Sequence, residues 1–411
     1  MIKYPKELNA IFNKLKSLNV KPIIVGGFMR DSLLGIDSKD IDIELYGISS
    51  FETLENILEE FGSVNSVGKS FGVCKLTIGA LDLDFSLPRL DSKIGSGHKG
   101  FEVQTKQNLD FSTASRRRDF TINTIGYDIL QEKILDPFDG ISDLNARVLN
   151  AVDAETFIQD PLRVLRAVQF SARFELKMSE KLSKLCKIMV KNSCLDELPK
   201  ERIFGEIQKL LLKASKISLG FKLVKELGML EYFSQLKSLN SDEWEQTLMT
   251  LDEMVKYRLN DDKRDMLLML SVLSYRLESE MALSFLMKIS DEKELSKKVL
   301  ALIKAKLSEK PTNYELYSLS NDINFEELLT LRLALEPQNV KIYEAIKKRV
   351  KELNILNQPL LPLIQGRDLI ELGVKPSPIF KSILHRCYEA QKNEKFMNHK
   401  EAIIWLKKSL S

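Results

Sequence analysis

The hydrophobic pattern of this chain changes near residue 140, and that change limits the folds open to it. Before that point, short β-branched or alternating runs, such as residues 20–25 and 40–45, are interleaved with helical segments. After it, apolar residues recur at helical spacing, as over residues 160–174, and no convincing alternating stretch follows. The sequence therefore predicts an α/β unit over the first third and an all-helical remainder.

The composition limits the metal sites and the cellular locations that we expect for this chain. The chain has 411 residues, 44% of them hydrophobic and 29% charged, which is typical of a folded protein of about two to four domains. Three histidines, four cysteines and no Cys-x-x-Cys pair make a zinc ribbon or a His-rich metal site hard to build. The first 15 residues are interrupted by charges, and the longest apolar run, at 267–275, is far too short for a bilayer. We therefore expect a cytoplasmic protein with no membrane partner.

Two adjacent glycines mark a predicted strand-to-helix turn. Gly26 and Gly27 follow the apolar run at residues 20–25 and precede a helical segment that carries Arg30 and Asp31. Glycines at such a turn let the backbone approach a ligand closely, and a helix start favours phosphate. Taken alone, a Gly-Gly turn is more often purely structural.

Two carboxylates follow on the next predicted strand. Asp40 and Asp42 are two residues apart, so their side chains project from the same face of the strand. Paired carboxylates are suitable ligands for Mg²⁺ bound to a triphosphate. A solvent-facing acidic strand is the competing interpretation, and the phosphate-type turn upstream favours the metal.

Two later segments are rich in arginine. Residues 116–123 contain three consecutive arginines followed by Asp119 and Asn123, which suits anionic phosphates and ribose hydroxyls, although a surface basic patch would look similar. Asp160 begins a predicted helix in which Arg163 and Arg166 are three residues apart and share a face. A capped helix with a charged side explains that segment equally well.

In their order and spacing, these motifs resemble those of class II tRNA nucleotidyltransferases and bacterial poly(A) polymerases. The resemblance covers about residues 23–212, and a weaker one to the tail of the tRNA enzymes covers 363–405. The matching segments are Gly26-Gly27-x-x-Arg30-Asp31, Lys39-Asp40-Ile41-Asp42-Ile43, Arg117-Arg118-Asp119-Phe120-Thr121-Ile122-Asn123, Asp136-Pro137-Phe138-Asp139-Gly140, Asp160-Pro161-Leu162-Arg163-Val164-Leu165-Arg166 and Pro199-Lys200-Glu201-Arg202-Ile203.

The resemblance implies an α/β head of polymerase-β nucleotidyltransferase type and all-α neck, body and tail in an elongated molecule. We expect the catalytic head at residues 1–138, the base-recognising neck at 139–214, the body at 215–330 and the tRNA-binding tail at 331–411. Before Phe138 there are 17 basic and 19 acidic residues, and after it 44 and 39. The mildly basic remainder suits RNA phosphates, to which a lysine cluster at 297–310 would contribute unless it is simply a solvated helix face.

The resemblance also implies a role for each motif. Asp40 and Asp42 would be the catalytic residues that hold Mg²⁺, which activates the RNA 3′-hydroxyl and neutralises the leaving pyrophosphate. Asp82 or Asp84 is a weaker candidate for a third carboxylate. The nucleotide would lie against Gly26, Gly27, Arg30, Asp31, Arg118, Asp119, Asn123, Asp160, Arg163 and Arg166.

The predicted neck helix explains nucleotide choice. Asp160 can accept and Arg163 can donate a hydrogen bond, and both cytosine and adenine present an amino donor beside a ring-nitrogen acceptor. Uracil and guanine present the reverse order, so this pair should select CTP and ATP without a template. The tRNA enzymes usually have Glu at the position of Gln159, and many relatives have Arg at that of Gln169. These departures put the fine tuning of base recognition in doubt, more than base recognition itself.

The expected function is therefore addition of C, C and A to the 3′ acceptor end of tRNA. In residues 68–75, Ser70 and Gly72 break the pattern of poly(A) polymerases, and residues 87–101 resemble the flexible loop that CC-adding relatives lack. The chain has no His-Asp pair, so a phosphohydrolase domain of the His-Asp type is not expected. An A-adding enzyme or a poly(A) polymerase remains an alternative, and a non-catalytic RNA-binding protein is a remote one.

Overall fold

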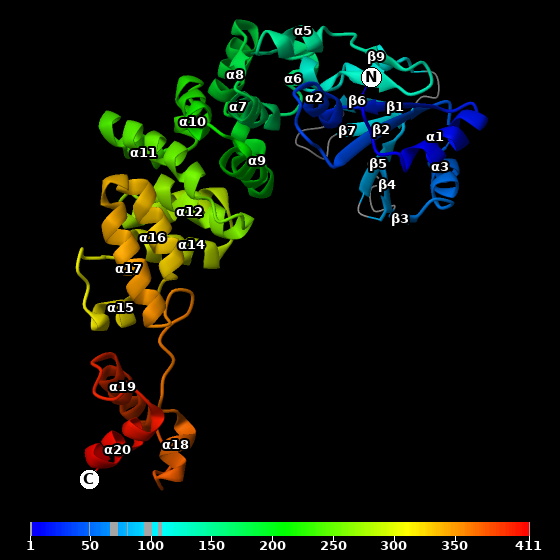
Figure 1. Ribbon diagram of the computed structural model, residues 1–411. Helices are drawn as coiled ribbons and strands as arrows, with labels where there is room; N and C mark the ends of the chain where they lie inside the picture. The colour runs from blue at the N-terminus through cyan, green and yellow to red at the C-terminus, as the bar shows by residue number, and fades with distance from the viewer. Residues whose placement is uncertain are drawn as a thin grey trace. The chain divides into compact units, whose positions relative to one another are not determined.

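A computed structural model describes residues 2–48, 50–65, 73–79, 81–93, 101–105 and 109–410, with the backbone alone for 90–93 and 101–105. The chain divides into two compact units, Met1–Tyr232 and Phe233–Ser411 (Figure 1). The first contains the sheet, and the second is helical. The predicted fold class, an α/β head followed by helices, is thus confirmed.

A seven-stranded mixed sheet in the order β3-β4-β5-β2-β1-β8-β9 organises the first unit. The central pair β2 and β5 is parallel, and the other neighbours are antiparallel. The strands are β1 (Lys21–Val25), β2 (Asp40–Tyr46), β3 (Ser63–Asn65), β4 (Val73–Ile78), β5 (Leu81–Ser86), β8 (Gly126–Asp128) and β9 (Lys133–Leu135).

The two faces of β2 differ, as the alternating pattern predicted. Ile41, Ile43 and Leu45 are buried in the core formed with α1 (Leu8–Ser17), α2 (Gly27–Leu33) and α3 (Phe51–Leu58). Because successive side chains point to opposite faces, Asp40, Asp42 and Glu44 all lie on the other face. The apolar face thus anchors the strand, and the acidic face is turned away from this core.

Helices complete the first unit. In the segment after the sheet, α7 packs against α9 and α10, and Gly220 on α10 allows a close approach, because an added Cβ would lie 2.5 Å from Leu210 Cδ1. The helices are α4 (Phe111–Ser115), α5 (Gly140–Asn145), α6 (Ala154–Phe157), α7 (Leu162–Phe174), α8 (Glu180–Lys191), α9 (Lys200–Lys213) and α10 (Ile217–Glu226).

Several short elements differ from the predictions. Strands β10 (Val148–Leu149) and β11 (Lys177–Met178) pair in the region expected to be all helix, and β8 and β9 were not predicted. At two or three residues each, they are too short to show a period. Part of the expected loop at residues 87–101 belongs to a hairpin of β6 (Arg89–Lys93) and β7 (Phe101–Thr105). The rest of that loop, residues 94–100, lies outside the described residues.

The second unit is a helical stack in which α12 is central, with every residue from Asp265 to Ser274 buried. A separate small core joins the last three helices through Leu369, Ile383, Phe396 and Leu406. The helices are α11 (Ser241–Met254), α12 (Asp262–Ser274), α13 (Ser279–Ile289), α14 (Lys293–Lys304), α15 (Asn313–Leu319), α16 (Phe325–Leu335), α17 (Val340–Glu352), α18 (Gly366–Glu371), α19 (Ile379–Lys392) and α20 (His399–Leu410). Among the described residues, no helix is both long and apolar enough to cross a membrane.

Candidate active site

One pocket of the first unit, about 390 Å³ in volume, gathers most of the predicted site residues. It lies where the sheet, the arginine run and α7 meet. Six arginines and three carboxylates line it, a balance that suits an anionic ligand. The lining residues are Gly26, Gly27, Arg30, Asp42, Arg89, Arg117, Arg118, Asp119, Asn123, Asp160, Arg163, Arg166 and Phe170.

Two predicted residues, Asp31 and Asp40, do not line this pocket. Asp31 is buried, and its carboxylate lies 2.6 Å from Nη2 of Arg30, which does line the pocket. Asp40 is exposed at the start of β2. The pocket also includes Arg89 and Phe170, which the sequence did not single out, although Phe170 is one helical turn beyond Arg166 and could have been found from that spacing.

The turn at Gly26 requires a glycine for two reasons. Its backbone has φ +72° and ψ −131°, a conformation that side chains with a Cβ rarely adopt. An added Cβ would also lie 3.0 Å from Arg118 Nη1 and 3.3 Å from Asp42 Oδ2. The strand register pairs Val25 with Asp42, which places the turn directly beside this carboxylate. The turn therefore brings backbone, carboxylate and guanidinium together at one end of the pocket.

Carboxylates are crowded on the acidic face of the sheet, opposite the apolar core. In the parallel register of β2 and β5, Asp40 is opposite Asp82 and Asp42 is opposite Asp84. Burial raises the pKa of Asp42, as do the charges of Asp84, Asp40 and Glu44, while Arg118 opposes the shift. A bound cation would relieve this repulsion, so the donor set fits a hard divalent ion.

On the neighbouring strand β5, the negative charge of the carboxylates is partly neutralised. Asp84 pairs with Lys75 at 3.1 Å, and Asp82 accepts a hydrogen bond from Thr77 Oγ1 at 2.9 Å. Among the residues that the structure describes, no three His, Cys, Asp or Glu side chains are arranged to hold a metal ion. Asp82 and Asp84 therefore stay predictions for a third carboxylate, next to the two candidate aspartates of β2.

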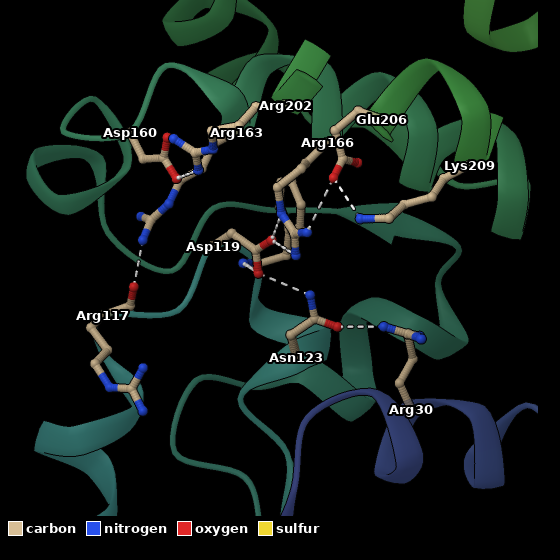
Figure 2. Close-up of polar contacts among 11 residues, drawn as sticks. Arg30, Arg117, Asp119, Asn123, Asp160, Arg163, Arg166, Arg202, Glu206 and Lys209 are labelled. Atoms are coloured by element: carbon tan, nitrogen blue, oxygen red, sulfur yellow. Dashed lines mark hydrogen bonds and ion pairs between the residues drawn. The ribbon is translucent and has the colours of Figure 1, made fainter. Parts of the chain in front are cut away.

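A largely buried polar network forms part of the pocket lining (Figure 2). Arg30 Nη1 donates to Asn123 Oδ1 at 2.7 Å, Asn123 Nδ2 donates to Asp119 Oδ1 at 2.9 Å, and Arg166 Nε donates to Asp119 Oδ2 at 2.7 Å. Burial tends to raise the pKa of Asp119, but the Arg166 charge and the Asn123 hydrogen bond outweigh it, so this pKa is below its usual value. Three segments far apart in sequence are thereby joined.

Aromatic rings support the same network. The Arg30 guanidinium lies over Phe174 at 4.4 Å and over Phe170 at 5.1 Å, and Arg166 lies 5.3 Å from the Phe170 ring. Arg30 is only 5% exposed, and its burial lowers its pKa despite the charge of Asp31. Both arginines are therefore held in place by their surroundings before any ligand binds.

The two predicted base-reading residues both line the pocket, and the Arg163 amide donates to the Asp160 carbonyl at 3.0 Å. Asp160 Oδ1 accepts from the Leu162 amide at 3.1 Å, and Oδ2 lies 3.2 Å from Arg202 Nη2. Arg163 donates to the Thr156 carbonyl at 2.9 Å and to the Arg117 carbonyl at 2.5 Å. The predicted helix cap is shifted by one residue, since Pro161 precedes the first helical residue and Asp160 caps it from outside.

Arg202 contacts Asp160, and the sequence analysis assigned no role to this arginine, although it lies in the last of the matching motifs. Figure 2 shows it beside Asp160, with Glu206 of the same helix reaching Arg166. The segment 68–72, which bears on the choice between family members, lies outside the described residues.

The second unit has a basic groove of about 560 Å³ between α14 and the end of α15. Lys297, Lys298, Lys304 and Lys306 line it, and all four are exposed. Lys297 and Lys304 are seven residues apart, which places them about 10 Å apart on one face of α14. Such a row of lysines is suited to successive phosphates of a nucleic-acid strand.

Comparison with known proteins identifies two domains. Residues 23–150 match the poly A polymerase head domain, and residues 257–406 match tRNA nucleotidyltransferase domain 2. Among curated proteins, the chain is 34% identical over 215 residues to a CCA-adding enzyme of Francisella tularensis, which is 52% of this chain and 56% of that protein. It is 28% identical over 352 residues to an A-adding tRNA nucleotidyltransferase of Aquifex aeolicus, which is 81% of this chain and 41% of the relative. The chain spans about half the length of the curated relatives that it matches.

Solved structures have the same fold. An apo CCA-adding enzyme superimposes with a TM-score of 0.73 at 21% identity, covering 99% of this chain and 97% of that one. The Thermotoga maritima CCA-adding enzyme in complex with a tRNA gives 0.68 at 22% identity, covering 100% and 97%. These likenesses establish the fold.

Proposed function

Because this chain belongs to the tRNA nucleotidyltransferase and poly(A) polymerase family, we propose that it adds C, C and A to the 3′ acceptor end of tRNA. CTP and ATP would be its substrates, and the cytoplasm its location. The observation that carries the proposal is the single pocket in which Asp42, the arginine run and the Asp160–Arg163 pair meet. A carboxylate for metal, cations for a triphosphate and a donor–acceptor pair for a base are the groups that this reaction needs.

Nucleotidyl transfer is an in-line displacement. The RNA 3′-hydroxyl gives its proton to water and its oxygen attacks the α-phosphorus, the bond between the α-phosphorus and the bridging oxygen breaks, and pyrophosphate leaves. Asp42, together with Asp40, would hold divalent cations, which we take to be Mg²⁺. When bound, these ions lower the pKa of the attacking hydroxyl and neutralise the leaving group.

The protein's own residues would orient the nucleotide. Arg118 lies beside Asp42 and Gly26, where it can bind triphosphate oxygens next to the metal ligands. Arg30, Asp119, Asn123 and Arg166 bond one another, so they would hold the ribose and phosphates as a rigid unit.

Base selection would rest on the carboxylate of Asp160 and the guanidinium of Arg163. In the structure Arg163 already donates to two backbone carbonyls, and Arg202 lies against Asp160. These contacts fix both side chains at the pocket wall and leave them to face a cytosine or adenine edge. Uracil or guanine, which present the reverse order of donor and acceptor, would leave Asp160 and Arg163 unpaired beneath the base. Such a site discriminates through the cost of these unpaired polar groups.

The test uses purified protein and tRNA transcripts that end before the first C, after the second C, or after the A. With CTP and ATP together, the shortest transcript should gain C, C and A and then stop. No incorporation into any transcript in the presence of Mg²⁺ would refute the proposal.

A-adding activity is a second candidate, favoured by the similarity to the Aquifex aeolicus A-adding enzyme over 81% of the chain. The same transcripts separate the two, because an A-adding enzyme extends only the transcript ending in CC. Long A tracts on any RNA would instead indicate a poly(A) polymerase.

We further propose the division into head (1–138), neck (139–214), body (215–330) and tail (331–411), with the body and tail holding RNA. The basic groove of α14 supports this role for the body, because its four lysines line one concave surface. Contacts of this kind read phosphate and shape and leave base selection to the neck.

A further inference from the structure

A buried carboxylate that the proposed chemistry does not use lies against two arginines of the pocket. Glu44 follows Asp40 and Asp42 at the same two-residue spacing on β2, so it lies on the same face of the strand. It is 0% exposed and does not line the pocket. A buried carboxylate is unfavourable unless its oxygens are paired, so its partners show what it does.

Both oxygens of Glu44 are bonded. Oε1 accepts from Arg117 Nη2 at 2.8 Å and lies 3.9 Å from Arg118 Nη2, and Oε2 accepts from the Tyr46 hydroxyl at 2.8 Å. Its oxygens are therefore taken up by protein donors, unlike those of an open metal ligand. Glu44 instead attaches the arginine run to the strand that carries the two aspartates.

The attachment extends to the base-reading arginine. The main-chain carbonyl of Arg117 accepts a hydrogen bond from Arg163 Nη2 at 2.5 Å, a contact visible in Figure 2. One residue thus holds Glu44 with its side chain and Arg163 with its backbone. A connected path runs from β2 through Arg117 to the neck helix α7, across residues that are 73 and 46 positions apart in sequence.

We propose that Glu44 is a positioning residue that sets nucleotide discrimination by holding Arg117 where its carbonyl orients Arg163. This rests on the proposed function, because it assumes that Arg163 reads the base. Loss of the Glu44 charge weakens the hold on the Arg117 side chain, so the Arg117 carbonyl, one of the two carbonyls that orient Arg163, shifts. CTP and ATP then lose the aligned Arg163 donor, whereas UTP and GTP, which do not pair with this donor, lose nothing.

The test compares kcat/KM for CTP, ATP, UTP and GTP in the full-length protein and in Glu44→Gln. We expect kcat/KM for CTP and ATP to fall about tenfold, with UTP and GTP changed less than twofold, so that discrimination falls about tenfold. A variant that loses the same factor for all four nucleotides would show a merely structural role and overturn the inference.

Asp128→Asn is the matched control. Asp128 is also 0% exposed, lies in the same sheet and pairs with Lys21 at 2.8 Å. Its partners Lys21, Leu130 and Gln131 do not line the pocket, whereas Arg117, the partner of Glu44, does. Its loss should lower thermal stability and leave the discrimination ratio unchanged. If Glu44→Gln does not fold, Arg117→Lys tests the same link, since it keeps the positive charge and removes the guanidinium nitrogen that donates to Glu44 Oε1 at 2.8 Å. Unchanged discrimination in a folded Arg117→Lys would then refute the inference.

The two hypotheses fail in different ways. Wild-type protein that incorporates no nucleotide into tRNA refutes the proposed function. Wild-type protein that discriminates, together with a folded Glu44→Gln that discriminates equally well, refutes only the role of Glu44.

Discussion

The turn at Gly26 has no room for a side chain, so Gly26→Ala should reduce both stability and activity. The backbone at φ +72° and ψ −131° is strained for alanine by about 1–3 kcal/mol. The new methyl would also lie 3.0 Å from Arg118 Nη1 and 3.3 Å from Asp42 Oδ2. Both side chains must shift by a few tenths of an ångström, and since misplacing reacting groups by about 1 Å costs about 100-fold, we expect a loss of roughly 10- to 100-fold in kcat/KM.

Gly35→Ala is the control that separates the effect of backbone strain from the effect of the close contacts with Arg118 and Asp42. Gly35 has φ +70°, but no atom lies within 4 Å of an added Cβ. Chemical denaturation should show a stability loss of about 1–2 kcal/mol for this variant, while nucleotide incorporation remains at the wild-type level. If Gly26→Ala lost stability to a similar extent and kept full activity, the close packing of turn, carboxylate and guanidinium would have no catalytic importance.

Three further predictions concern the metal ligand, the base reader and the basic groove. The raised pKa of Asp42 means that its ionised form is disfavoured in the fold, so its stability contribution is lost as pH rises through the folded pKa. Asp42→Asn should therefore unfold at a higher temperature than wild type at pH 7 in the presence of a chelator, lose that advantage near pH 3, and incorporate no nucleotide. Arg163→Ala should lose discrimination against UTP and GTP by at least tenfold, measured by competition between nucleotides; full discrimination would contradict the base-reading role. Lys297→Ala combined with Lys304→Ala should reduce the slope of log K against log salt for tRNA binding by about 1.5, and an unchanged slope would place the RNA elsewhere.

Local patterns in the sequence were sufficient for the main elements of the head. The alternation at residues 40–45 predicted β2 and its acidic face, because a strand has a period of two that is visible over six residues. The glycine pair predicted the turn before α2. The three-residue strands β8 and β9 were missed, since their pairing partners and not their own pattern define them.

The sequence by itself determined which chemical groups the site could use: two aspartates on one strand face, an arginine run and an Asp–Arg pair at a helix start. Only the tertiary structure decided how they are connected. It placed Asp84 opposite Asp42, Arg202 against Asp160, and Glu44 under Arg117, and it left Asp31 and Asp40 outside the pocket. The physical reason is that periodicity and capping act over a few residues, whereas these contacts join positions 42 to 73 apart and depend on how the sheet and the neck helices pack.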